Sequence, residues 1–475
     1  MEPTEQLRIG LCGIGLEAYW AQFAGLEKKL ERHIDEVADR TTRPEISIVN
    51  LGLIDTPVSA REASHKFRTA DVDLLFIYIT TYAVSSIVLP LVQRAGAPVI
   101  VLNLQPDAAI DYSAFNQLKD CTAMTGSWLE YCSACPAPEI ANLMQRAKIP
   151  FRQVTGTLQD DLTWSEIEEW LSAAAVKSAL ASNRLGLIGH YYNGMLDVMT
   201  DVTQIAITFG SHVEVLEVDE LSGLRAEFGD VATAERVKEF REQFDVQSDC
   251  DAKELERAAR TSLALDAFVA RHALTSMAYY YEGTGNAANL DTMSSIILGT
   301  SILTARHIPV AGEYEVKNAI AMKIMDSFGA GGSFTEFYAV DYKEDLLLMG
   351  HDGPGHVGIA EGKTKVRPLQ VYHGKVGSGV SIEMSVRHGP ITLLSVVEDA
   401  ETRFKLLAAE GECVAGDILE IGNTNSRYRF PLGAREFLEQ WNAEGPAHHC
   451  AVGVGHVAGR IKKLANLLEI HFRQV

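Results

Sequence analysis

The sequence predicts an α/β protein in which two doubly wound parallel-sheet α/β domains precede a β-rich, barrel-like C-terminal domain. Short β-rich segments alternate with helical segments along residues 1–180, and the same alternation restarts near residue 185. From residue 366 onward the chain is rich in strand patterns and poor in helical ones. We therefore expect domains at residues 1–180, 181–330 and 331–475.

The first domain is expected to alternate strands and helices. Strands are predicted at residues 9–14, 46–51, 74–79, 99–104 and 151–155, and helices at 19–37, 60–69, 138–148 and 164–182, with loop at 104–106 and 122–131. Residues 74–92 carry no charge, but Pro90 and several hydroxyl side chains interrupt them. A buried strand that leads into a helix explains this run better than a membrane span.

The central domain repeats the pattern, with strands predicted at residues 185–188, 213–218 and 276–281. Exposed helices are expected over 219–251, an amphipathic helix over 252–272, and one buried helix over 290–306 that leads to Val310 and Glu313. His190 follows the first of these strands. It is either a ligand or substrate contact, or a histidine that is only hydrogen-bonded in a turn.

The C-terminal domain is expected to be an antiparallel barrel or sandwich. After strands at 334–340 and 346–349, further strands are predicted at residues 366–372, 379–386, 391–397, 404–409 and 417–420, broken by Gly, Asn and Pro. A short helix at 437–441 and a closing helix at 457–468 complete this part of the chain.

The composition excludes several classes of partner. With 63 acidic and 42 basic residues, the net charge of -21 would repel a nucleic-acid backbone and anionic lipid, and no basic patch offsets it. The first residues lack an export signal, so we expect a cytoplasmic protein without a membrane anchor. The seven scattered cysteines fit a reducing compartment. The pair Cys132 and Cys135 suits packing better than redox or zinc chemistry, and Cys450 is expected to line the site beside His449.

Carboxylates and imidazoles gather in residues 312–356, between glycine-rich turns and apolar strands. Glu313 lies just ahead of a short helical pattern whose Lys317 and Lys323 are expected to face outward. Glu336 falls within a predicted strand, and His351 directly follows another. Functional side chains are common at such element ends.

Two further imidazoles, His448 and His449, follow far downstream. Two carboxylates with one or two imidazoles suit an octahedral Mn²⁺, Co²⁺ or Mg²⁺ better than a thiolate-rich zinc site. The residue types therefore predict a site for a hard divalent cation.

At four motifs the sequence resembles the L-arabinose isomerase family, within the wider group that includes L-fucose isomerase. The motifs are Gly312-Glu313 with Lys317, the glycine-rich run 331–336, Gly350-His351 and 447–449, and they occur in the family's order and spacing. The resemblance implies a manganese site, with Co²⁺ or Mg²⁺ as alternatives, formed by Glu313, Glu336, His351 and His449. It also implies that the two glutamates move the proton.

The candidate substrate-binding residues are His448, Met195, Tyr281, Tyr338, Glu17 and Tyr19. For Tyr281, core packing is the alternative to a sugar contact. The sequence differs from the family at Met124, at Glu315, where the family has Asp, and at residues 352–356. In the last of these segments, Asp352 or His356 could join the metal shell or select the sugar. Alternatively, its Gly-Pro-Gly turn could be only a connection. The resemblance further implies a homo-oligomer, a trimer or hexamer, in which one subunit's N-terminal domain completes a neighbour's pocket.

These observations predict a metal-dependent aldose–ketose isomerase that acts on a pentose or 6-deoxyhexose-type sugar. Moving one proton between C1 and C2 through an enediol requires a base and an acid, which Glu313 and Glu336 would supply. A hydride shift would use the same residues. The alternatives are a metal-dependent epimerase on a related sugar or polyol, and a non-catalytic carbohydrate-binding protein.

Overall fold

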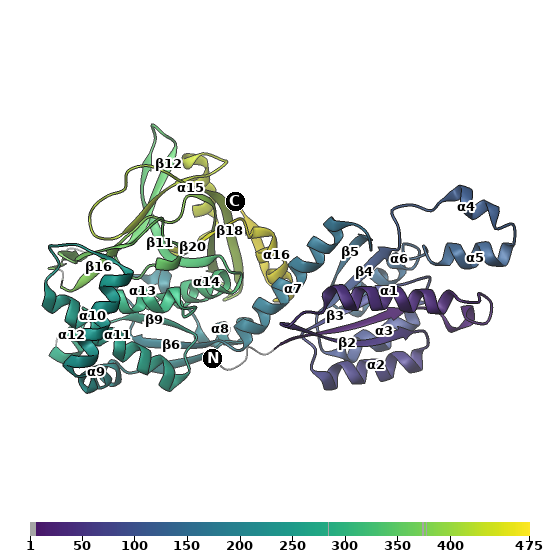
Figure 1. The fold of residues 1–475 in the computed structure, drawn as a ribbon, viewed down its shortest axis with the longest axis horizontal. Coiled ribbons are helices and arrows are strands. Elements are labelled where there is room, and N and C mark those ends of the chain that lie inside the picture. Colours follow the sequence, from purple (N-terminus) through teal and green to yellow (C-terminus); the bar gives the residue numbers. More distant parts are fainter. Residues whose placement is uncertain (1–5, 284, 373–374, 377) are drawn as a thin grey trace. The chain divides into compact units, whose positions relative to one another are not determined.

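The computed structural model describes residues 6–283, 285–372, 375–376 and 378–475 (Figure 1). The chain forms two compact units, Met1–Ser178 and Ala179–Val475. Each unit contains a parallel sheet, and the second unit also contains a β-rich C-terminal sheet, which confirms the predicted fold class. A further boundary near residue 330 stays a prediction. Among the described residues, no helix has the length and apolarity that a bilayer crossing requires.

The first unit is a doubly wound α/β structure (Figure 1). Its parallel sheet has the order β2-β1-β3-β4-β5. The strands are β1 (Leu7–Ile14), β2 (Ile46–Ile54), β3 (Leu74–Ile79), β4 (Val99–Gln105) and β5 (Phe151–Thr157). The helices are η1 (Glu17–Tyr19), α1 (Leu26–Thr41), α2 (Pro57–Ala70), α3 (Ser85–Ala95), α4 (Tyr112–Gln117), α5 (Cys121–Leu129), α6 (Ala137–Ala147) and α7 (Asp161–Ala181). The apolar run at 74–92 is indeed a buried strand followed by a helix.

Two expectations for the first unit are wrong. The helix predicted over 19–37 begins only at Leu26, because Gly25 takes a left-handed φ of 84° and starts α1 there. The loop predicted over 122–131 is largely helix α5, whose first turn is capped by the Asp120 carboxylate accepting from Ala123 N at 2.7 Å. The weak apolar periodicity of α5 concealed it in the sequence.

The second unit begins with a parallel sheet of order β10-β9-β6-β7. Its strands are β6 (Arg184–Gly189), β7 (His212–Leu216), β9 (Ser276–Tyr280) and β10 (Val310–Ala311). The helices of this part are η2 (Leu196–Val198), α8 (Val202–Phe209), α9 (Val218–Glu227), α10 (Asp230–Gln243), α11 (Ala252–His272), α12 (Ala287–Met293), α13 (Ile297–Ala305) and α14 (Val316–Ser327). The single helix predicted over 290–306 is broken into α12 and α13, and the Ser295 hydroxyl donates to Asp291 O at 2.8 Å at the break.

The C-terminal part of the second unit forms a closed barrel. Its sheet has the order β17-β20-β11-β12-β19-β18-β21, and a β17–β18 pairing closes the ring. The strands are β11 (Gly331–Asp341), β12 (Leu346–His351), β17 (Gly389–Glu398), β18 (Phe404–Val414), β19 (Thr424–Arg429), β20 (His449–Val454) and β21 (His471–Gln474). The smaller elements are β8 (Asp245–Val246), η3 (Val357–Ile359), β13 (Lys365–Pro368), β14 (Val371–Tyr372), β15 (Lys375–Val376), β16 (Val380–Glu383), α15 (Ala434–Ala443) and α16 (Ala458–Leu467). The predicted strand at 417–420 is absent, and β19 follows it instead.

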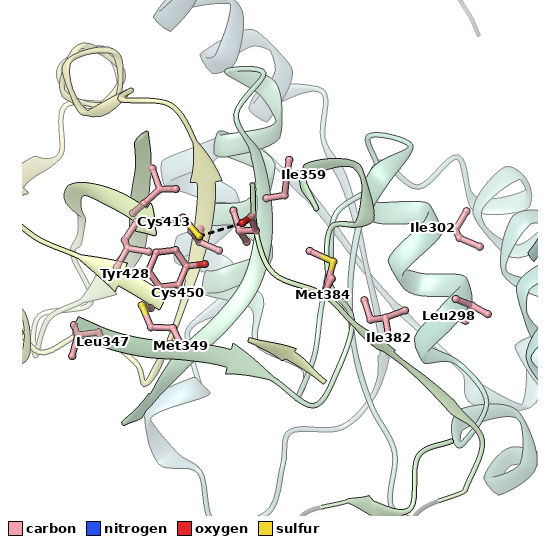
Figure 2. Packing of buried hydrophobic residues seen from close by; sticks show 14 of the residues in the cluster. Leu298, Ile302, Leu347, Met349, Ile359, Ile382, Met384, Cys413, Tyr428 and Cys450 are labelled. Carbon is pink, nitrogen blue, oxygen red and sulfur yellow. Dashed lines mark hydrogen bonds between the residues drawn. The ribbon is translucent and has the colours of Figure 1, made fainter. Parts of the chain in front are cut away.

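The interior of this part is apolar, and Cys450 belongs to it (Figure 2). Cys450 is 1% exposed and lies in one cluster with Met349, Cys413 and Tyr428. Since side chains alternate along a strand, Cys450 faces the core while its neighbour His449 faces the other way. The expectation that Cys450 lines the site is therefore wrong.

Candidate active site

Glu313 stands on a strained turn at the carboxyl end of β10. Glu313 and Tyr314 both have left-handed backbone conformations, with φ of 54° and 60°. Each such residue costs roughly 1–3 kcal/mol and persists only where its surroundings enforce it. Here Tyr314 N donates to Tyr279 O and Glu315 N donates to Gly312 O, each at 3.0 Å. The turn buries the Glu313 side chain, of which 2% is exposed.

The register of the barrel places Glu336 next to two other candidates. On β11, Glu336 lies opposite His449 of β20 on one side and opposite Gly350 of β12 on the other. A Cβ on Gly350 would lie 1.8 Å from Thr424 O, so only glycine permits β19 to approach here. His351 follows this glycine, and its backbone N donates to Thr424 Oγ1 at 3.0 Å.

Three imidazoles approach the Glu313 carboxylate. The Nε2 atom of His351 lies 3.8 Å from Glu313 Oε1. On the other side, Glu313 Oε2 lies 3.5 Å from His449 Nε2 and 3.8 Å from His448 Nε2. Ligand atoms of Glu313, His448 and His449 all fall within 4.8 Å of one another, so His448, which the sequence places at the substrate, could also join a metal site.

Phe334 packs against two of these rings. Its side chain is 0% exposed, and its ring centroid lies 4.4 Å from that of His351 and 4.3 Å from that of His449. Because Phe334 precedes Glu336 by two residues on the same strand, the motif that carries the glutamate also supplies the wall that holds the imidazoles.

The donor set fits a divalent cation. Atoms that bind one ion at about 2.1 Å lie about 3 Å apart when cis and about 4 Å apart when trans. The distances from the Glu313 oxygens to the three Nε2 atoms, 3.5 and 3.8 Å, lie within that range. Carboxylate and imidazole donors suit Mn²⁺ or Co²⁺, and carboxylates also suit Mg²⁺. This residue set could hold such an ion.

Burial changes the proton affinity of both glutamates. It raises the pKa of Glu313 to about 7, although the neighbouring His448 lowers it. Burial likewise raises the pKa of Glu336, again opposed by His448. Because its pKa is about 7, Glu313 can both take and return a proton near neutral pH.

A pocket of about 540 Å³ opens beside this group and is lined by Glu336, His448 and Tyr338. The Tyr338 hydroxyl accepts a hydrogen bond from Asn423 Nδ2 at 3.1 Å, and the same amide nitrogen donates to Asp352 at 2.5 Å. Asp352 therefore contacts the pocket wall through Asn423.

The described lining of this pocket does not include the remaining substrate candidates. Met195 is half-buried and directly precedes η2. Tyr281 packs on the core of the parallel sheet, with its ring 6.3 Å from His190, and its hydroxyl accepts from Asn289 at 3.5 Å. Glu17 and Tyr19 form η1 in the first unit. Their roles, like those of the other candidates, stay predictions.

The structure describes the surroundings of two further histidines and corrects one expectation. His190 is held locally, since Nδ1 lies 2.8 Å from Tyr191 O and Nε2 accepts from Glu282 N at 3.3 Å. His356 is 6% exposed, and its backbone N donates to Ser333 Oγ at 3.1 Å, so the 352–356 turn is tied to β11. Lys317 and Lys323 do not face outward. Lys317 is 6% exposed, and the Lys323 side chain is 12% exposed.

Three residues that the sequence did not single out for a role also belong to the site. Glu315 contacts His449, Asp197 contacts His448, and Asn423 contacts Tyr338. Glu315 could have been found as a third acid beside Glu313. Asp197 could not, because 251 residues separate it from its partner.

Comparison with known proteins agrees with the resemblance noted in the sequence. Residues 331–471 match the family described as L-arabinose isomerase C-terminal domain. The L-arabinose isomerase of a Nocardioides species is 24% identical over 344 residues, which cover 69% of this chain and 67% of that protein. These matches make the chain an enzyme of the isomerase class. Over the matched residues it is similar to L-arabinose isomerases.

Solved structures give only faint similarity. A substrate-binding protein of a sugar ABC transport system from Bordetella parapertussis is 12% identical, with 65% of this chain and 86% of that chain covered and a TM-score of 0.15. An ABC transporter solute-binding protein from Agrobacterium vitis, bound with α-D-tagatopyranose, is 11% identical, with 79% and 94% covered and a TM-score of 0.14. Scores of this size carry no argument about fold or ligand.

Proposed function

We propose that the chain is a metal-dependent aldose–ketose isomerase that acts on a pentose or 6-deoxyhexose-type sugar. The observation that carries this proposal is the approach of His351, His448 and His449 to the two oxygens of buried Glu313, beside Glu336. The matches to L-arabinose isomerase support the reaction class.

Glu313, Glu336, His351 and His449 would hold the cation, with His448 close enough to join them. When bound, a divalent cation would stabilise negative charge that develops on the two sugar oxygens beside the reacting carbons. The raised pKa values of Glu313 and Glu336 suit one carboxylate to remove the proton from C2 and the other acid to deliver a proton to C1.

The charges of the pocket favour a neutral sugar. Its lining contains the acids Asp197 and Glu336 together with His448, and no lysine or arginine is among its described lining residues. A phosphate or carboxylate on the substrate would meet these acids with no lysine or arginine among the described lining residues to pair with it. We therefore propose an unphosphorylated aldose as substrate.

The proposal is tested by incubating the protein with a panel of aldopentoses and 6-deoxyhexoses in the presence of Mn²⁺, Co²⁺ or Mg²⁺. NMR then identifies the product. We expect a ketose product, loss of activity on chelation and its return with Mn²⁺, and a loss of about 10²–10⁴-fold for Glu336→Gln. An epimeric aldose would indicate the epimerase instead. Full conversion by Glu336→Gln, or by the chelated protein, would overturn the assignment.

The homo-oligomer implied by the family resemblance stays a prediction. Sedimentation velocity of the purified chain would detect a trimer or hexamer directly.

A further inference from the structure

Asp197 forms a two-point contact with His448 at the edge of the pocket. Its Oδ2 atom accepts from His448 Nδ1 at 2.6 Å and from the backbone N of the same residue at 3.0 Å. The opposite ring nitrogen, Nε2, lies 3.8 Å from Glu313 Oε2. Asp197 Oδ2 thus binds the Nδ1 side of the imidazole, while the Nε2 side faces Glu313.

The segment that carries Asp197 is itself anchored. The Lys317 ammonium, at the start of α14, donates to Asp197 O at 2.6 Å and reaches Met199 O at 3.4 Å. Val198, between them, is 0% exposed. The C-terminal half of the short helix η2 is therefore tied to the same helix that begins beside Glu313, and this contact helps to set the position of the Asp197 carboxylate.

His448 needs such a support, because it is the least enclosed of the three imidazoles. Its side chain is 35% exposed, against 2% for His351 and 0% for His449. The ring packs on His449 with centroids 3.8 Å apart, which fixes its plane on one side only. Without a partner at Nδ1, rotation about the side-chain bonds would move Nε2 out of the pocket.

We propose that Asp197 is a positioning residue for His448. By accepting the Nδ1 proton, Asp197 fixes the ring orientation and the Nδ1–H tautomer, and so presents Nε2 as an acceptor toward a hydroxyl of the sugar. This role rests on the proposed isomerase function, in which His448 lines the sugar pocket. Asp197 acts through His448 and does not itself touch the reacting carbons.

Steady-state kinetics of Asp197→Ala, Asp197→Asn, His448→Gln and the double variant Asp197→Ala/His448→Gln test this inference. We expect Asp197→Ala to lower kcat about 10- to 100-fold with little change in KM. Asp197→Asn, which keeps an acceptor oxygen, should recover part of the loss. In the His448→Gln background, Asp197→Ala should have little further effect, because both changes remove the same interaction.

Asp201→Ala is the matched control, since Asp201 caps α8 through Thr203 N and Gln204 N, four residues further along the chain. We expect it to keep the wild-type kcat. If Asp197→Ala keeps kcat, or lowers it equally with and without His448, Asp197 is not a positioning residue. Failure of the wild-type enzyme to convert any sugar would instead reject the proposed function.

Crystal structures of the wild type and of Asp197→Ala provide a readout that needs no turnover. We expect His448 Nδ1 on Asp197 in the wild type and a rotated or disordered His448 ring in the variant, with His449 unchanged. An unchanged His448 ring in Asp197→Ala would overturn the inference even if the substrate were never found.

Discussion

Glu315 Oε2 lies 2.5 Å from His449 Nδ1, inside a site where neither side chain is more than 1% exposed. A carboxylate at this position accepts the Nδ1 proton, so the lone pair of Nε2 points toward Glu313, 3.5 Å away. Glu315 is also the N-cap residue of α14, so a side chain at the start of one helix orients an imidazole that belongs to the barrel. The contact links the parallel-sheet part of the second unit to β20.

Glu315→Gln should therefore weaken binding of Mn²⁺ about 10- to 100-fold, because an amide holds the required tautomer of His449 less firmly. Isothermal titration calorimetry of the chelated protein measures this. Asp326→Asn is a suitable control, because Asp326 makes a comparable contact with His307 at 2.8 Å. An unchanged affinity in Glu315→Gln, or an equal loss in Asp326→Asn, would contradict the role given to Glu315.

The raised pKa of Glu313 predicts a pH-dependent stability in the metal-free protein. Burial raises this pKa from 4.5 to about 7, so the folded state binds the proton more tightly than the unfolded state. The free energy of unfolding therefore falls as pH rises from 4.5 to 7, by at most about 3 kcal/mol. Glu313→Gln cannot ionise and should lack this loss.

Urea unfolding of the chelated wild type and Glu313→Gln at several pH values between 4.5 and 8 measures the difference. The variant should gain stability relative to the wild type as pH rises, and the gain should level off above pH 7. Added Mn²⁺ should stabilise only the wild type strongly. Parallel curves for the two proteins would show that Glu313 does not titrate in this range.

We expect Phe334 to contribute to metal binding as well as to the stability of the core. Phe334→Leu removes the ring that packs on His351 and His449, so we expect lower stability together with weaker Mn²⁺ binding. Phe437→Leu is the control, since Phe437 of α15 stacks on Phe430 in the core, with ring centroids 3.8 Å apart. Phe437→Leu should lower stability without changing metal affinity. Equal effects of both variants on binding would show that Phe334 is only a core residue.

Much of this fold could be predicted because the relevant signals are local. The β-rich runs 74–79 and 99–104 and the amphipathic helix Ala252–His272 match the structure closely. Helix starts that depend on a glycine or on a capping side chain were harder to predict. The start of α1 depends on the φ of Gly25, and α5 depends on the cap at Asp120, neither of which apolar periodicity reveals.

The site could be predicted only where its residues lie in recognisable motifs. Such motifs carry Glu313, Glu336, His351 and His449. The structure brings the segments of all four together through the register of β11 with β12 and β20 and the turn after β10. Asp197 lies in a segment without a motif, and its contact with His448 exists only after folding. The expectation that Lys317 faces outward was wrong because helical periodicity does not show that another segment, here η2, covers the polar face of the helix.

Lys317 offers a final prediction, because it joins η2 to α14 without touching the imidazoles. Lys317→Met keeps the apolar stem but leaves Asp197 O and Met199 O without the ammonium donor. Loss of a hydrogen bond to a charged group costs about 1.5–3 kcal/mol. Since η2 carries Asp197, we also expect kcat to fall in parallel with Asp197→Ala.

Lys323→Met is the matched control on the same helix, because Lys323 contacts Asp326 at 3.8 Å and His307 O at 3.4 Å, away from η2. Thermal unfolding should show destabilisation of both variants, whereas kinetics should show a loss of kcat only in Lys317→Met. If both lysine variants lower kcat alike, the effect is one of general stability. If Lys317→Met leaves kcat intact, η2 keeps its position without the ammonium, and the support of Asp197 must come from the buried Val198 alone.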